Sequence, residues 1–256
     1  MFVEQRLEQL LQALSSAGSL TVEQAVELAD VSADTVRRDF NRLAERGLAV
    51  RTHGGIMSRD GYVHDSPIRE RKVQRAAEKA AIARAAAALV VDNETIALDG
   101  GTTTFGVIEH LRADLTLTVI TYSLDAAIEV ARRPNMSAIV LGGLVREPTL
   151  SVVGPDAMAM VGNFHANTLL LGANGVSLEL GLMTPNRMEA QLKTALIGIS
   201  DRVVLLADSS KIHKRALVTF GSLQAVTTLV TDAGADPSFL EQLRQSGIEV
   251  IIAQQE

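Results

Sequence analysis

The chain has no cysteine among its 256 residues, which excludes a disulfide framework, thiol catalysis and a thiolate metal site. Its first residues lack a basic region followed by an apolar run, so we expect no signal peptide. The longest apolar-looking stretch, residues 76–91, is interrupted by Glu78, Lys79 and Arg84 and is not expected to span a membrane. The five histidines never share a metal-ligand spacing. These absences predict a cytoplasmic protein with no membrane contact, no metal and no cofactor, but they do not single out a function.

Residues 32–40, Ser-Ala-Asp-Thr-Val-Arg-Arg-Asp-Phe, predict the start of a helix that reads DNA. Ser32 is a favourable N-cap residue, and Val36, Phe40 and Leu43 recur at the spacing of one apolar stripe. Arginines off this stripe can bind guanine in the major groove or clamp phosphates. An ordinary amphipathic surface helix is the alternative on these residues alone. The candidate DNA contacts on this helix are Ser32, Thr35, Arg37, Arg38, Asn41 and Arg42.

The flanking segments favour a winged helix-turn-helix over residues 1–58. A first amphipathic helix is expected around residues 6–14, and a capping box at Thr21 and Gln24 opens a second over roughly 21–29. The tight turn at residues 30–31 then leads into Ser32, as in a helix-turn-helix. Residues 48–53 and 56–58 flank Gly54-Gly55, which predicts a hairpin with a two-residue turn. We expect this wing to carry Arg51 and His53 towards the DNA backbone or minor groove.

The net charge of −6 argues against a nucleic-acid binder until its distribution is considered. Residues 32–59 carry six arginines and three carboxylates, a local charge of +3, so the rest of the chain carries −9. A basic face on an acidic body still supplies phosphate contacts, and the body limits nonspecific binding.

A polar linker and a connector helix are expected over residues 59–90. Ser66 and Pro67 have the character of an N-cap and a first helical residue, and the alanine-rich sequence that follows predicts one long helix to about Val90. This helix could simply pack on the following sheet, or it could transmit the state of a bound ligand to the DNA-binding domain.

Residues 91–256 alternate between strands and helices. Apolar strand candidates lie at 95–98, 117–120, 138–141, 168–171, 203–207, 228–231 and 249–252, and helical stretches lie around 103–112, 124–133, 155–161, 187–200 and 237–246. The fold class is therefore α/β: a winged helix-turn-helix followed by a doubly wound, mainly parallel α/β effector domain.

Small and polar residues follow most of these strands, where open parallel sheets bind ligands. The segment Asp99-Gly-Gly-Thr-Thr-Thr104 leads into a helix, whose free amides together with the threonine hydroxyls suit an anion such as phosphate. A single segment of this kind is usually only a turn, but several at the strand ends of one sheet favour a ligand site. The candidate effector-binding residues are Asp99, Gly100, Gly101, Thr102, Thr103, Thr121, Tyr122, Ser123, Gly142, Gly143, Gly172, Asn174, Gly175, Lys193, Asp208 and Lys211.

The chain resembles the DeoR-type bacterial transcriptional regulators over nearly its whole length. The N-terminal half carries Arg6, Leu10, Leu14, Ser32, Thr35-Val-Arg-Arg-Asp-Phe40 and Arg51-Thr-His-Gly-Gly55. The second half carries Asp99-Gly-Gly-Thr-Thr, Thr121-Tyr-Ser, Leu141-Gly-Gly and Ala207-Asp-Ser-Ser-Lys. Tyr122 departs from the pattern, since the family more often has asparagine there. The resemblance implies a repressor, usually of a sugar-catabolism operon, whose effector domain has a fold similar to ribose-5-phosphate isomerase and glucosamine-6-phosphate deaminase.

The resemblance to those enzymes raises the question of turnover. The isomerases carry an acidic Asp-Gly-Ala-Asp-Glu-Val-Asp segment after a strand, where this chain has Leu-Gly-Ala-Asn-Gly-Val-Ser at 171–177. Because moving protons between sugar carbons requires carboxylates, we expect binding without catalysis. A sugar-phosphate isomerase or deaminase with a DNA-binding head is the alternative, and an architectural DNA binder whose second domain only oligomerises is a third hypothesis.

The partners expected are double-stranded operator DNA and a phosphorylated sugar that releases the protein from it. The phosphate is expected in the loop of residues 99–104 with Lys211 assisting, and Asp99 is expected to bind sugar hydroxyls. One winged domain reads only a few base pairs, so we also expect a homo-oligomer, a dimer or tetramer, held through residues after about 66. The sequence does not specify the sugar, the operator or the regulated genes.

Overall fold

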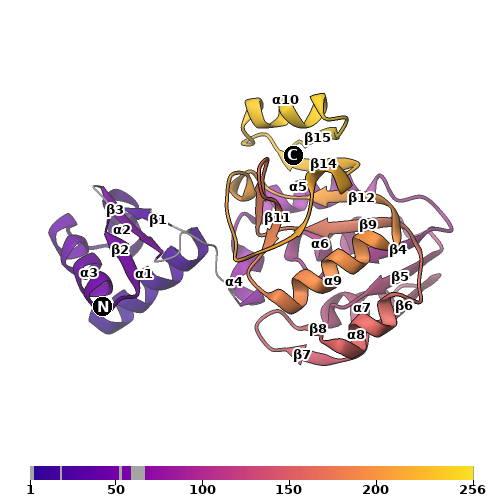
Figure 1. Ribbon diagram of the computed structural model, residues 1–256, viewed down its shortest axis with the longest axis horizontal. Helices are drawn as coiled ribbons and strands as arrows, with labels where there is room; N and C mark the ends of the chain where they lie inside the picture. Colours follow the sequence, from indigo (N-terminus) through magenta and orange to yellow (C-terminus); the bar gives the residue numbers. More distant parts are fainter. Residues whose placement is uncertain (1–2, 18, 52–53, 59–66, 256) are drawn as a thin grey trace.

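A computed structural model of the protein describes residues 3–17, 19–51, 54–58 and 67–255 (Figure 1). A small helical domain with a three-stranded sheet comes first, and a larger α/β domain follows. Within these residues, no helix is both long and apolar enough to cross a membrane.

The N-terminal domain has the expected three helices. They are α1 (Val3–Ala17), α2 (Val22–Ala29) and α3 (Ala33–Glu45). The capping box is present: Gln24 N donates to Thr21 Oγ1 at 3.2 Å, and Thr21 N donates to Gln24 Oε1 at 3.0 Å. Helix α2 ends at Asp30, whose φ of 50° turns the chain towards α3. Leu7, Leu10 and Phe40 are fully buried in the shared core, so the helices pack as the apolar stripes predicted.

The wing is part of a sheet with strand order β1-β3-β2, formed by β1 (Ser19–Thr21), β3 (Gly55–Ser58) and β2 (Ala49–Arg51). The two-residue turn predicted at Gly54 and Gly55 is wrong, because Gly55 is the first residue of β3 and pairs with Thr21. A Cβ at Gly55 would lie 2.1 Å from the carbonyl oxygen of Leu20. The absence of a side chain at Gly55 therefore permits the close approach of β1 and β3. The last residue pair between β2 and β3 is Arg51 with Ile56.

The single connector helix predicted up to Val90 is also wrong. The structure has a short α4 (Ile68–Val73) and a separate α5 (Ala76–Ala87). Arg75 interrupts the helix with a left-handed φ of 52°, and its guanidinium lies 3.4 Å from both Asp208 and Asp232. These contacts hold a backbone conformation that arginine rarely adopts. Helix α5 packs on the sheet, with Ile82, Ala83 and Ala86 fully buried.

The second domain is built on seven parallel strands in the order β15-β14-β12-β9-β4-β5-β6. Their bounds are β4 (Thr95–Leu98), β5 (Leu117–Thr121), β6 (Met136–Val140), β9 (Ala166–Gly172), β12 (Ser200–Leu206), β14 (Thr228–Asp232) and β15 (Glu249–Ala253). All seven contain a predicted strand or overlap one, which confirms the α/β prediction.

Each face of this sheet has its own hydrophobic core. One core contains buried residues of α5, α6 (Thr102–His110) and α7 (Leu124–Ala131). The other contains residues of α8 (Pro155–Val161), α9 (Arg187–Gly198) and α10 (Pro237–Gln245). Neighbouring residues of β4 alternate between the cores: Ile96 and Leu98 lie in the first and Ala97 in the second. The domain is therefore doubly wound.

Two small antiparallel sheets were not predicted. One pairs β7 (Leu144–Arg146) with β8 (Ser151–Val153), and the other has the order β10-β11-β13, formed by β10 (Gly175–Ser177), β11 (Gly181–Thr184) and β13 (Val218–Gly221). These strands have only three or four residues, at or below the shortest run in which an alternating pattern indicates a strand.

The strand order reverses at the centre of the large sheet. From β4 the chain adds β5 and β6 on one side, and then returns to place β9 on the other side of β4. Ligand clefts of open α/β sheets form at such a reversal, outside the carboxyl ends of the strands.

Candidate functional site

Helix α3 has a packed face and a solvent face. Val36, Phe40 and Leu43 are fully buried, whereas the predicted DNA contacts Arg37, Arg38, Asn41 and Arg42 are exposed. Ser32 caps the helix as expected, accepting from Thr35 N at 3.3 Å, and the two hydroxyls lie 3.0 Å apart. The structure therefore places all six predicted residues at the start or along the solvent face of one helix.

The arginines of this face have only weak partners. Arg37 pairs with the exposed Asp34 at 3.0 Å, and Arg38 Nε donates to the Asp34 carbonyl at 3.3 Å. Arg42 lies 3.6 Å from Asp39. The pair of Arg37 with Asp34 is exposed and contributes little free energy, and Arg42 is itself exposed although Asp39 is buried, so these arginines can reach phosphates or guanines.

A buried ion pair, absent from the predicted site, fixes α3 on α1. Arg6 Nε donates to Asp39 Oδ2 at 2.6 Å and Arg6 Nη2 donates to Asp39 Oδ1 at 3.3 Å. Asp39 is 1% exposed and Arg6 7%. This bidentate contact sets the orientation of the DNA-facing helix.

Arg51 lies at the end of β2, beside α3. Its Nη1 donates to the Gly55 carbonyl at 2.7 Å, and its guanidinium carbon lies 5.5 Å from the centre of the Phe40 ring. The exposed arginine is thus held between the wing and α3. His53, the other residue predicted for the wing, lies outside the described residues.

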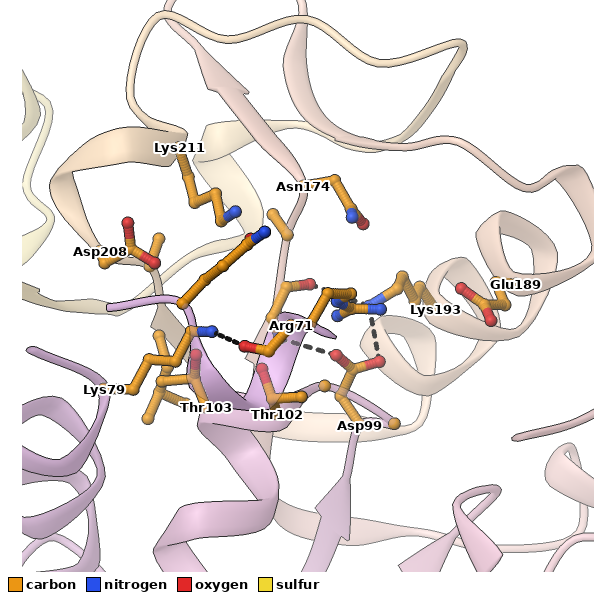
Figure 2. Close-up of a pocket in the computed structure, with 17 residues that line it drawn as sticks. Arg71, Lys79, Asp99, Thr102, Thr103, Asn174, Glu189, Lys193, Asp208 and Lys211 are labelled. Carbon is orange, nitrogen blue, oxygen red and sulfur yellow. Dashed lines mark hydrogen bonds and ion pairs between the residues drawn. The ribbon is translucent and has the colours of Figure 1, made fainter. Parts of the chain in front are cut away.

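A second site lies where the large sheet reverses. Loops after β4, β9 and β12 surround a polar pocket together with residues from α4 to α5 and from α9 (Figure 2). Ten predicted effector residues line it: Asp99, Gly100, Gly101, Thr102, Thr103, Gly172, Asn174, Lys193, Asp208 and Lys211. The fold thus brings these ten residues, predicted from their positions after strands, into one cavity.

Asp99 and Lys193 form a buried ion pair at the inner wall of the pocket. Lys193 Nζ lies 2.6 Å from Asp99 Oδ1 and donates to the Gly172 carbonyl at 2.9 Å. Gly172 N donates to Asp99 Oδ2 at 3.0 Å, and the Tyr122 hydroxyl donates to Asp99 Oδ1. Burial, and then the charge of Asp99, raises the pKa of Tyr122, so the hydroxyl stays a donor. Asp99 therefore joins the loops after β4 and β9 and holds Lys193 in place.

The remaining six predicted residues do not line the pocket. Thr121 donates to the Leu98 carbonyl at 2.8 Å, and Ser123 caps α7 by accepting from Ala126 N at 3.3 Å. Thr121 therefore holds the end of β5 against β4, and Ser123 holds the start of α7. The residues that the structure keeps outside the lining are Thr121, Tyr122, Ser123, Gly142, Gly143 and Gly175.

Three cations gather on the outer side of the pocket. Arg71 comes from α4, Lys79 from α5 and Lys211 from the single turn Ser209–Lys211 after β12. Burial, and then the charge of Lys211, lowers the pKa of Lys79 to about 8. Burial also lowers the pKa of Lys211, and nearby arginines add to this effect against the opposing charge of Asp208. Asp208 offsets part of this charge, and the three cations together keep an excess of positive charge that favours an anion.

Three residues at this outer side were not predicted. The pocket is also lined by Arg71, Gln74 and Lys79. They precede the first strand of the large sheet, so a prediction of ligand-binding residues from the ends of strands does not include them. The alanine-rich sequence around Lys79 indicated only a helix, and no sequence signal pointed to a break at Arg75.

Glu189, which is not among the candidate effector-binding residues, also lines the pocket. Its Oε1 accepts from Thr149 and Ser151 at 3.0 Å each and from Arg146 of β7. Asn174 accepts from Thr184 at 3.1 Å. These contacts place carboxylate and amide groups at the end of the pocket near Lys193, where sugar hydroxyls can be bound.

Helix α6 adds an anion-binding element at the floor of the pocket. Its N-cap is Gly101, which has no side chain to satisfy the amides of the first turn, and Thr102 and Thr103 follow. Free amides and the positive end of the helix dipole favour negative charge there. The pocket thus has one end that suits an anion and another that suits hydroxyl groups.

Comparison with known families matches both domains. Residues 6–61 match the DeoR-like helix-turn-helix domain, and residues 74–233 match the DeoR C terminal sensor domain. The second match alone covers more than half of the 256 residues. The chain belongs to the DeoR family. The predicted family membership and regulatory, DNA-binding character are therefore confirmed.

DeoR-family relatives match over nearly the full length of both chains. An uncharacterized regulator of Bacillus subtilis, YulB, is 34% identical over 98% of this chain and 96% of its own. The repressor CsqR of Escherichia coli is 33% identical over 98% of this chain and 96% of its own.

These relatives are transcriptional regulators, which confirms the prediction of a DeoR-family regulator rather than an enzyme. Ribose 5-phosphate isomerase A from Neisseria gonorrhoeae is similar at 19% identity with a TM-score of 0.40, over 54% of this chain and 53% of the isomerase. A likeness of that size carries no argument about catalysis.

Proposed function

We propose that the protein is a repressor of a carbohydrate-catabolism operon that a phosphorylated sugar releases from its operator. The observation that carries this proposal is the pocket at the sheet reversal, with an excess of cations at one end and hydrogen-bonding groups at the other. A sugar monophosphate carries a dianionic group and several hydroxyls, so its two ends match the two ends of the pocket.

The phosphate group would lie at the first turn of α6, between Lys79 and Lys211. The amides of Thr102 and Thr103 and the two ammonium groups supply the donors. The sugar would extend towards Asn174 and Glu189. Both oxygens of Asp99 already accept bonds from the protein, so we assign it to holding Lys193 and not to binding hydroxyls.

DNA would be bound through the solvent face of α3 and the wing. Arg38, Asn41 and Arg42 would enter the major groove from α3, and Arg51 would contact the backbone beside it. A homo-oligomer would pair two such domains on two half-sites. We place the protein in the cytoplasm, where prokaryotic operators and metabolic sugar phosphates occur together.

The proposal is tested with the full-length protein bound to labelled DNA from upstream of its own gene and of the neighbouring genes. Fluorescence anisotropy would follow release as pentoses, hexoses and their monophosphates are added in matched pairs. We expect one monophosphate to release DNA at a concentration at least tenfold lower than its parent sugar. Equal release by the neutral sugar would contradict the phosphate placement, and no release by any compound would contradict the effector proposal.

A further inference from the structure

The segment that joins the two domains also forms one wall of the effector pocket. Arg71 and Gln74 line the pocket, and they belong to residues 67–75, which comprise α4 and the bend at Arg75 and are called here the connector segment. In Figure 2, Arg71 lies between Lys79 on one side and Lys193 on the other. In the sequence, this segment directly follows residues 59–66, which lead from the DNA-binding domain.

The pocket as it stands is too small for the proposed ligand. Its cavity is about 40 Å³, which is room for about three water molecules. A sugar phosphate needs several times that space. The strands β4 and β9 and helix α9 belong to the packed core, and the turn that carries Lys211 is tied to β14 by the bond from Ser209 N to Asp232 at 2.6 Å. The connector segment is therefore the wall that can move to admit a ligand.

Before the bend at Arg75, which is itself anchored by ion pairs, the connector segment is held by few contacts. In α4 only Ile68 is buried, and Val73 is 76% exposed. Ile68 N donates to the Pro148 carbonyl at 2.7 Å. Lys72 pairs with Asp125 at 3.0 Å and lies 4.9 Å from the centre of the Phe105 ring. Such a segment opens locally at small free-energy cost. The bend at Arg75, with its φ of 52°, marks the end of the part that can move.

The positive charge of the Arg71 side chain favours closure of the connector segment once an anion is bound. Its guanidinium has no hydrogen bond or ion pair with any residue that the structure describes, and Lys211 Nζ also has none there. Lys79 donates only to the backbone carbonyl of Arg71 among the described residues. Asp208 offsets only part of the charge of the two lysines, so the remaining repulsion among the three cations disfavours the closed arrangement until an anion binds.

We propose that the connector segment opens to admit the effector and is then held closed by Arg71 bound to the effector's anionic group. This inference rests on the proposed anion site and adds how binding at that site is transmitted to the DNA-binding domain. Closure fixes the point at which residues 59–66 join the sensor domain, so ligand binding alters the placement of the DNA-binding domains without any contact between ligand and DNA.

Hydrogen exchange of the full-length protein with saturating inorganic phosphate as the probe tests the inference. Arg71→Met removes the charge and keeps the apolar stem. Arg69→Met is the matched control, because Arg69 lies on the same helix, is exposed and does not line the pocket. In the wild type and the Arg69 variant, we expect phosphate to slow exchange about tenfold at residues 67–75 and also at the first turn of α6. In the Arg71 variant, we expect slower exchange at α6 only.

Three results would overturn the inference. In the first, phosphate protects the first turn of α6 in the wild type but leaves residues 67–75 unchanged, so the anion site stands and the closure does not. In the second, Arg71→Met keeps the protection of residues 67–75, or Arg69→Met loses it equally. In the third, phosphate protects neither segment, which removes the proposed anion site and the closure with it.

Discussion

The buried ion pair between Arg6 and Asp39 makes the DNA-binding domain sensitive to one substitution. Asp39→Asn keeps the shape of the side chain but leaves the guanidinium of Arg6, 7% exposed, without its counter-charge. Breaking a buried pair in this way costs about 3 kcal/mol. A domain of this size rarely has more than about 3–5 kcal/mol of stability from one core. We therefore expect most of the stability of the domain to be lost.

Hydrogen exchange of the full chain measures this loss directly. A change of about 3 kcal/mol corresponds to about a hundredfold faster exchange of the α3 amides, while the amides of the large sheet should be unchanged. Asp34→Asn is the matched control, since its carboxylate is 81% exposed and, among the residues that the structure describes, pairs only with Arg37; the expected change there is within about twofold. Arg6→Met with Asp39→Leu should recover much of the stability, because an apolar pair leaves no buried charge. A change below about threefold for Asp39→Asn would refute the reasoning.

Four further predictions concern binding and assembly. Arg38→Ala should weaken operator binding by about 1–3 kcal/mol in gel-shift titrations, and an equal loss on random DNA would assign the residue to phosphates; unchanged affinity would remove it from the interface. Lys211→Ala should keep DNA affinity but require about tenfold more effector for release, since one charged contact is lost; an unchanged requirement would exclude Lys211 from the site. Effector affinity should decline as the pH rises through about 8, where Lys79 loses its proton, and calorimetry should show Lys79→Met flattening this decline. Sedimentation should find an oligomer, whereas a monomer that binds operator tightly would contradict paired half-site binding.

The elements that the sequence predicts well are those determined locally. Helix α3 begins at Ser32 because the serine hydroxyl accepts from the amide of Thr35, and its stripe of Val36, Phe40 and Leu43 lies within one element. The same holds for the strands of the large sheet, whose apolar runs fill cores on both faces.

The features that the sequence does not predict depend on distant contacts. Arg75 breaks the connector helix because Asp208 and Asp232, more than 130 residues later, hold its guanidinium. Tyr122 follows a strand, as the predicted ligand residues do, but its side chain points to Asp99 inside the protein. A position at a strand end therefore identifies the correct edge of the sheet, while only the packing decides which side chains reach the cavity.

The way in which α5 covers the sheet has a consequence for dividing this chain into fragments. A sensor fragment beginning at residue 91, where the regular alternation of strands and helices starts, would lose Ile82, Ala83 and Ala86 from one core and would expose the sheet beneath them. One beginning at residue 74, where the match to the sensor family starts, would keep that core and lose Arg71. A fragment beginning at Pro67, the N-cap of α4, retains that core, the whole of α4 and every residue that lines the pocket.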